Sequence, residues 1–148
     1  MKVLEFISSE KELYDLRMKP VAERYGLTAM ELSILLFLAN NPEHDTATEI
    51  AEIRHLAKSH VSTSVRTLVE KGLMEKEHRD GNHRTTHLVL LPASEEIISA
   101  GQRSQTEFTS ALTENFSEDE LRQLEMFISR MNENVHRALQ EGIRIGER

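Results

Sequence analysis

The chain has 148 residues and a net charge of −7, is 39% hydrophobic and 29% charged, and contains no cysteine. These values predict a single soluble domain with its own core, and they exclude disulfides, thiolate metal sites and cysteine-based redox sensing. No apolar run approaches the roughly 18 residues of a membrane span, and the N-terminus lacks a signal-peptide pattern, so we expect a cytoplasmic protein without membrane contact.

Residues 1–25 carry apolar side chains at steps of three and four, which predicts a helix. Proline removes a backbone donor and clashes with the preceding turn, so we expect Pro20 to kink or break this helix near Lys19. Gly26 is suited to end it.

Two capping boxes follow, each a Thr with a Glu three residues later, at residues 28–31 and 46–49. The first predicts a helix through about Asn40. That helix is apolar nearly all round, so it should be central to the core. The second predicts a short helix to about Arg54.

A longer helix is predicted from about Lys58 to Lys71, with Gly72 after its end. Val61, Val65 and Leu68 form its inward stripe. Its outward residues, short and polar or basic, are Lys58, Ser59, His60, Ser62, Thr63 and Arg66. The second helix of a helix-turn-helix needs such a face to read bases in the major groove. A polar surface without function is more often Glu and Lys.

Residues 73–78 and 84–91 predict two strands. The Asp80-Gly81 pair between them supplies the positive φ angles of a tight hairpin turn. The tip of this hairpin would be a wing that enters the narrow, strongly negative minor groove. Its candidate contacts are Arg79, Asn82, His83 and Arg84. The alternative is an ordinary solvated loop.

Charge is unevenly distributed along the chain. Residues 54–87 hold seven Lys and Arg against four Asp and Glu, a net +3, whereas the remainder is −10. A basic patch on an acidic body is typical of a DNA-binding protein, although chance clustering would give the same count. Five histidines in this segment lack metal-ligand spacing, so we expect no metal or cofactor. No catalytic motif occurs, and we expect no enzyme activity.

A helical region is predicted over residues 92–113, and a third capping box at residues 117–120 opens a final helix. Apolar residues recur along that helix at alternating steps of three and four: Leu121, Leu124, Ile128, Met131, Val135 and Leu139. This heptad-like stripe indicates a helix that packs on another helix, often from a second subunit. Packing within one chain is the alternative.

The order of these motifs resembles that of MarR/SlyA-type transcriptional regulators over residues 29–135. The resemblance is carried by the segments Ala51-Glu52-Ile53, Leu56-Ala57-Lys58-Ser59-His60-Val61-Ser62, Leu68-Val69-Glu70-Lys71-Gly72-Leu73-Met74, Asn82-His83-Arg84, Leu88-Val89-Leu90-Leu91-Pro92 and Phe116-Ser117-Glu118-Asp119-Glu120-Leu121. It implies a dimer joined by the first and last helices, a pseudo-palindromic operator, Arg84 as the wing arginine, and relief of repression by a small ligand.

Four residues depart from the family pattern. Asn82 stands where an Asp that pairs with the wing arginine is usual, which implies that Arg84 is less rigidly held. Ala57 replaces the usual capping Ser, so the recognition helix is expected to start later, with Ser59 as its cap. His55 replaces a turn Gly, and Leu91 replaces a Thr.

We therefore expect a mainly α winged helix-turn-helix chain with a small β-hairpin wing. Its regions are an N-terminal dimerisation helix region (1–27), a DNA-binding region (28–92) and C-terminal dimerisation helices (93–148). The expected function is a homodimeric, DNA-binding repressor; the alternative is a winged-helix protein-interaction module that does not bind DNA. A cleft between the first two helices and the helix after Pro92 would hold a small apolar or aromatic anion as effector. Its candidate residues, which fit a plain core better, are Leu13, Tyr14, Leu16 and Phe37.

Overall fold

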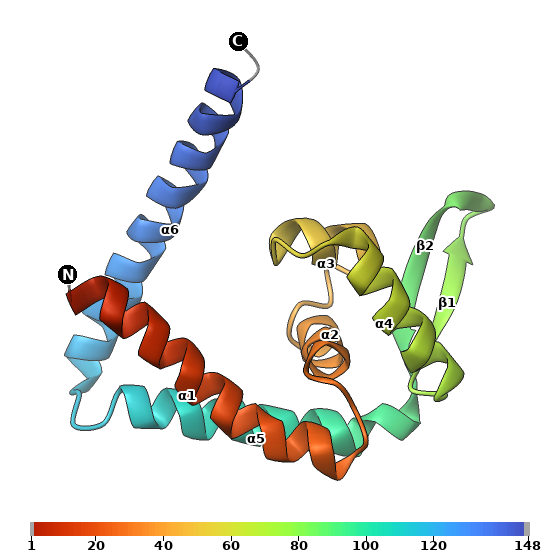
Figure 1. Ribbon diagram of the computed structural model, residues 1–148, viewed down its shortest axis with the longest axis horizontal. Coiled ribbons are helices and arrows are strands. Elements are labelled where there is room, and N and C mark those ends of the chain that lie inside the picture. Colours follow the sequence, from red (N-terminus) through yellow and green to blue (C-terminus); the bar gives the residue numbers. More distant parts are fainter. Residues whose placement is uncertain (1, 147–148) are drawn as a thin grey trace. The chain divides into compact units, whose positions relative to one another are not determined.

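The computed structural model describes residues 2–146, with side chains for 2–142. In chain order the elements are α1 (Lys2–Arg24), α2 (Ala29–Asn40), α3 (Ala47–Ile53), α4 (Lys58–Glu70), β1 (Met74–Arg79), β2 (Asn82–Leu90), a 3-10 turn (Pro92–Ser94), α5 (Glu95–Leu112) and α6 (Glu118–Gly146) (Figure 1). They form two compact units, residues 1–109 and 110–148. The expected fold class, mainly α with a hairpin wing, is confirmed. No helix in the described part of the chain has the length and apolarity of a membrane span.

Helix α1 continues unbroken through Pro20, so the break expected near Lys19 is wrong. Proline lacks the N–H that would bond the carbonyl four residues back, but Met18 and Ala22 on either side of it are buried in the core and hold the helix across this position. Helix α1 lies along α5 (Figure 1), because the Ser104 hydroxyl donates to the Arg17 carbonyl at 2.9 Å and Gln105 Nε2 donates to the Tyr14 hydroxyl at 3.0 Å. The Tyr14 ring also meets Phe108 edge-on, with ring centroids 5.2 Å apart.

Helix α2 supplies much of the core, as its sequence predicts: Leu32, Ile34, Leu35 and Leu36 are each at most 2% exposed. Helix α5 approaches it closely at Gly101. A Cβ on that residue would lie 2.7 Å from Leu36 Cδ2. The glycine therefore makes room for α2 at the expense of helix propensity.

The capping boxes at the starts of α2 and α3 are both formed. The Glu31 N–H donates to the Thr28 hydroxyl at 3.1 Å, and the Thr28 N–H donates to Glu31 at 3.3 Å. Thr46 and Glu49 exchange the same pair of bonds at 3.2 and 3.1 Å. Because each box lies within four consecutive residues, the starts of α2 and α3 could be predicted correctly from the sequence.

Helices α1, α3 and α4 end alike, in a Schellman motif. After each cap, one residue takes a positive φ, and the next N–H bonds a carbonyl five residues back. The positive φ angles are 65° at Gly26, 52° at His55 and 71° at Gly72. The closing bonds are Leu27 to Ala22 at 2.9 Å, Leu56 to Ala51 at 2.9 Å and Leu73 to Leu68 at 3.0 Å. His55 thus occupies a backbone conformation that glycine fills in the other two motifs.

Strands β1 and β2 pair antiparallel, with Met74 opposite Leu90 and an irregularity between Glu77 and Arg79. Asp80 and Gly81 have φ angles of 53° and 69°, which confirms the predicted hairpin turn. The base of the hairpin is tied to the loop before α3, because the Leu88 N–H donates to the Asp45 carbonyl at 2.7 Å.

In the second unit, α6 begins with the predicted capping box: the Ser117 N–H donates to Glu120 at 2.7 Å, and the Glu120 N–H donates to the Ser117 hydroxyl at 3.2 Å. Of its heptad-like stripe, Leu124 is half-buried and the other members are exposed. Their exposed fractions are 38% for Leu121, 49% for Ile128, 58% for Met131, 54% for Val135 and 45% for Leu139.

Candidate nucleic-acid interface

The outward face of α4 is the one that the sequence predicted. All six candidate residues from Lys58 to Arg66 are exposed, while Val61, Val65 and Leu68 beneath them are at most 2% exposed. The Thr63 hydroxyl donates to the Ser59 carbonyl at 2.9 Å, so its proton is used inside the helix. The Thr63 hydroxyl oxygen can still accept a hydrogen bond.

Helix α4 begins at Lys58, and Ala57 is its N-cap. The expectation that Ser59 would cap a later start is therefore wrong. The Ala57 backbone takes the extended cap conformation without a polar side chain, at φ −65° and ψ 128°, and its carbonyl accepts the His60 and Val61 amides at 3.1 Å each. No side chain in the described part of the chain bonds the first-turn amides of α4. Burial of Val61 holds the start of the helix instead.

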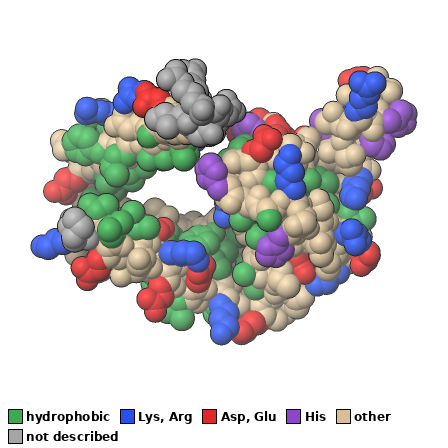
Figure 2. All heavy atoms as spheres, turned by 45° about the horizontal axis from the view of Figure 1, so that its top comes forward, with side chains coloured by type: hydrophobic (Ala, Val, Ile, Leu, Met, Phe, Trp, Pro, Cys, Tyr) green, Lys and Arg blue, Asp and Glu red, His purple; other side chains and the backbone are tan. Residues whose placement is uncertain are grey.

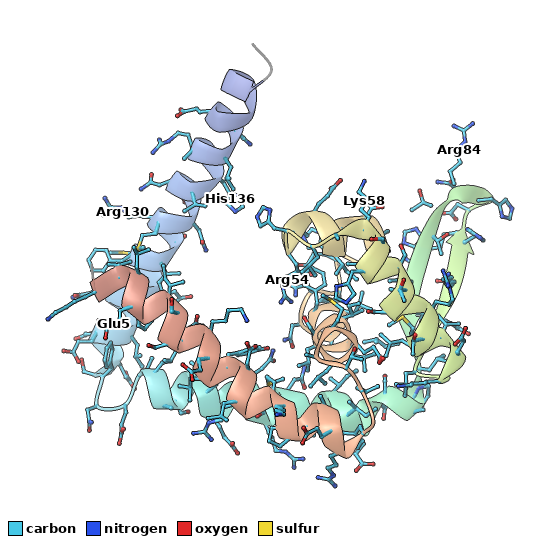
Figure 3. All side chains as sticks on the ribbon, viewed as in Figure 1. Glu5, Arg54, Lys58, Arg84, Arg130 and His136 are labelled. Atoms are coloured by element: carbon cyan, nitrogen blue, oxygen red, sulfur yellow. The ribbon has the colours of Figure 1, made fainter. Side chains whose placement is uncertain are left out.

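Arg84 stands at the wing tip and extends away from the hairpin (Figure 3). Its guanidinium has no ion-pair partner among the described residues. Asn82 Oδ1 instead accepts the Arg84 backbone N–H at 2.9 Å, and its Nδ2 donates to the Thr85 hydroxyl at 3.4 Å. Asn82 therefore fixes the backbone that carries Arg84 and leaves the side chain free. His83 is also exposed and lies against His78, with ring centroids 5.0 Å apart.

Arg79, the fourth candidate of the wing, is engaged within the protein. Its Nη1 lies 2.9 Å from Asp45 Oδ2 and its Nε lies 3.0 Å from Glu77 Oε2. The hydrogen bonds that Arg79 donates, first to Glu77 and then to Asp45, raise the pKa of Arg79. Burial raises the pKa of Asp45, but hydrogen bonds from His87 and Arg79 outweigh it, and the net pKa is below the ordinary value. The sequence could not reveal this partner, which lies 34 residues away.

Other Lys and Arg side chains lie on the surface of the molecule (Figure 2), and some of those in the DNA-binding region form no ion pair. Lys71 is used internally, since its Nζ donates to the Gly26 carbonyl at 2.8 Å and lies 3.5 Å from the buried Glu31 carboxylate. Within residues 54–87, all of which the structure describes, five cations have no ion pair: Arg54, Lys58, Arg66, Lys76 and Arg84. Figure 3 shows Arg54, Lys58 and Arg84 on separate elements of the same unit.

The four candidate cleft residues differ widely in exposure. Leu16 is 67% exposed and Phe37 is 6% exposed, while Leu13 is half-buried. Tyr14 lines a pocket of about 280 Å³ between α1, α2 and the turn after α3. Residues of that pocket which the sequence did not single out include Lys11, Met18, Met30, Arg54 and Leu56. Among described residues, no group of three or more His, Asp or Glu could hold a metal ion.

Residues 25–85 match the model of the MarR family. No curated protein matches the sequence. Among solved structures, the chain is similar to a MarR family transcriptional regulator from Listeria monocytogenes complexed with a 26mer DNA, with a TM-score of 0.78 and 14% identity over 90% of this chain and 87% of that one. It is also similar to the transcriptional regulator SlyA, with a TM-score of 0.77 and 18% identity over 91% and 94%. The S. aureus MepR–DNA complex gives 0.67 and 21% over 90% and 94%.

Proposed function

Because residues 25–85 form the winged helix of the MarR family, we propose that this protein is a sequence-specific DNA-binding transcriptional regulator. The observation that carries the proposal is the combination of a short, polar and basic outward face on α4 with an unpaired Arg84 at the wing tip. Two of the solved structures that share the fold were determined with DNA.

In this proposal α4 lies in the major groove. Arg66 is long enough to bond guanine through two parallel N–H groups. Ser59, Ser62 and Thr63 contact bases or phosphates. Lys58 and the first-turn amides of α4 meet the phosphate backbone, since helix N-termini favour anions.

The wing would enter the minor groove beside it. Arg84 supplies the positive charge that a narrow minor groove attracts, and His83 lies next to it. Asn82 acts by holding the Arg84 backbone at 2.9 Å.

We propose a homodimer as the DNA-binding form. The support is the apolar surface that one chain leaves exposed. One part of it is the α6 stripe. The other is on α1, where four apolar side chains are each at least 54% exposed: Val3, Leu4, Phe6 and Ile7. A two-fold dimer would place its two α4 helices in successive major grooves, about 34 Å apart, and so read a pseudo-palindromic operator. We propose repression as the outcome, by occupation of that site.

The pocket that contains Tyr14 is the site we propose for a small effector. It combines Arg54, which has no ion pair among the described residues, with apolar walls from Met18, Met30 and Leu56. Lys11 also lines the pocket, but it is paired with Asp15 of the same lining at 2.6 Å. That lining suits a small aromatic anion. Binding there would relieve repression by moving the turn between α3 and α4.

The decisive experiment is selection of bound genomic fragments, followed by affinity measurements across a salt series, with and without aromatic carboxylates. Five free cations per chain, or ten in a dimer, limit the slope of log affinity against log salt to about −9. Arg84→Ala should weaken binding at all sequences, whereas Arg66→Ala should also change sequence preference. Selection of no fragment, or binding insensitive to salt, would favour the protein-interaction module instead.

A further inference from the structure

One carboxylate holds both strands of the wing at their base. Asp45, in the loop between α2 and α3, lies 2.9 Å from Arg79 of β1 and 2.7 Å from His87 of β2. Its side chain is 20% exposed and that of His87 is 23% exposed. Glu77, opposite His87 in the hairpin register, completes the charged group by pairing with Arg79 at 3.0 Å.

The proton positions make Asp45 the centre of this group. His87 Nδ1 lies 2.7 Å from Asp45 Oδ1, and a carboxylate accepts only, so this nitrogen must carry a proton and donate. It therefore cannot also accept from Arg79 Nη1, which is 3.3 Å away. Both donors converge on the two oxygens of Asp45, and loss of that carboxylate removes the side-chain bond to each strand.

The same residue also acts through its backbone. The Asp45 carbonyl accepts the N–H of Leu88, the residue after His87, at 2.7 Å, and Leu88 is 5% exposed. The loop before α3 thus bonds β2 through the main chain and the side chain of Asp45, and it bonds β1 through the Asp45–Arg79 ion pair. These three bonds at the base set the angle at which the hairpin leaves the core, and Arg84 at the tip follows that angle.

We propose that Asp45 is a positioning residue for DNA binding, and that Arg79 serves DNA binding through Asp45 rather than by contact with phosphate. This inference rests on the proposed DNA-binding function. It replaces the expectation that Arg79 is one of the wing's DNA contacts.

Simple electrostatics and this anchor make opposite predictions for Asp45. Removing an acidic charge from a DNA-binding surface tightens binding if the charge only repels phosphate. If Asp45 holds the wing, Asp45→Asn weakens binding although it removes a repulsive charge. We expect a loss of about tenfold, the usual scale for members of one hydrogen-bonded network.

For Arg79 the discriminating quantity is the salt slope. A lysine or arginine that neutralises a phosphate contributes about 0.9 to the slope of log affinity against log salt. If Arg79 is an anchor that acts through Asp45, Arg79→Gln should weaken binding about tenfold and change the slope by the same amount as Asp45→Asn does, because both variants displace the same wing. A slope for Arg79→Gln that is shallower than that of Asp45→Asn by about 0.9 per chain marks a phosphate contact of Arg79 and overturns the proposal.

The experiment measures binding of the full chain to a selected genomic fragment by fluorescence anisotropy, at several salt concentrations. The variants are Asp45→Asn, Arg79→Gln, the double variant and Arg79→Lys, with circular dichroism to verify folding. Glu75→Gln is the matched control, because it removes an acid from an exposed position of β1 that makes no ion pair among the described residues.

We expect each single loss of charge to weaken binding, the double variant to bind within about twofold of either single one, and Arg79→Lys to keep most of the affinity. Glu75→Gln should bind as tightly as the wild type or more tightly. Unchanged or tighter binding by Asp45→Asn overturns the anchor while the proposed function stands. Failure of the wild-type chain to bind any fragment overturns both.

Discussion

The turn between α3 and α4 offers a sharp test of backbone strain. His55 has a φ of 52° and closes a Schellman motif that glycine closes at two other helix ends. The left-handed conformation costs a non-glycine residue about 1–2 kcal/mol, while glycine costs about 0.5–1 kcal/mol in chain entropy. The difference predicts that His55→Gly raises the free energy of unfolding by about 0.5–1 kcal/mol.

Two features of the structure make this estimate clean. The His55 side chain is exposed and makes no hydrogen bond or ion pair among the described residues, so its removal breaks no contact. A matched variant lies at the end of α4: Gly72 has a φ of 71°, and an added Cβ would meet nothing within 4 Å. Gly72→Ala therefore isolates the backbone cost and should lower the free energy of unfolding by about 1 kcal/mol.

The assay is urea unfolding followed by circular dichroism, at one fixed protein concentration because the chain is expected to dimerise. For a chain of this size, 1 kcal/mol corresponds to about 2–4 °C in Tm. The two variants should shift the midpoint in opposite directions. A lower midpoint for His55→Gly, or a higher one for Gly72→Ala, would refute the reasoning about positive φ.

Three further outcomes are expected. Thr46→Ala removes the N-cap of α3 and should lower the free energy of unfolding by about 1 kcal/mol in urea titrations. The pKa of Asp45 is depressed in the folded state, since bonds from His87 and Arg79 outweigh the effect of burial; its contribution is thus complete above the ordinary Asp value of about 3.9 and is lost as pH falls through the folded pKa. Asp45→Asn should then cost about 1 kcal/mol at pH 7, and this difference should close in acid titrations. Met131→Glu, on the exposed stripe of α6, should shift a dimer towards monomer in sedimentation equilibrium, whereas Gln123→Glu should not.

Much of this fold follows from signals within a few residues of one another. The pair Thr28 and Glu31 marks the start of α2 because both halves of the capping box lie within one turn. The Asp80-Gly81 pair marks the hairpin turn because few other residues accept two consecutive positive φ angles. The outward face of α4 could be predicted since Val61, Val65 and Leu68 fix which side is buried.

The features that sequence reasoning missed depend on partners far along the chain. From the sequence, Arg79 is predicted to be a free cation of the wing, whereas in the structure it is paired with Asp45. Lys71 looks in the sequence like a solvent-exposed cation, whereas in the structure it donates to the Gly26 carbonyl and pairs with the buried Glu31. Local rules also failed where packing overrides them: Pro20 lies within a continuous helix, and Ala57 serves as a cap without a polar side chain.

The wing divides into a base and a tip that depend on different residues. The base is held by Asp45, through its backbone bond to Leu88 and its side-chain bonds to Arg79 and His87. The tip, residues 80–84, depends only on its own turn and on the Asn82 bond. In engineering terms the tip is an exchangeable cassette: another two-residue turn with different side chains can be grafted there, and the base will present it at the same angle.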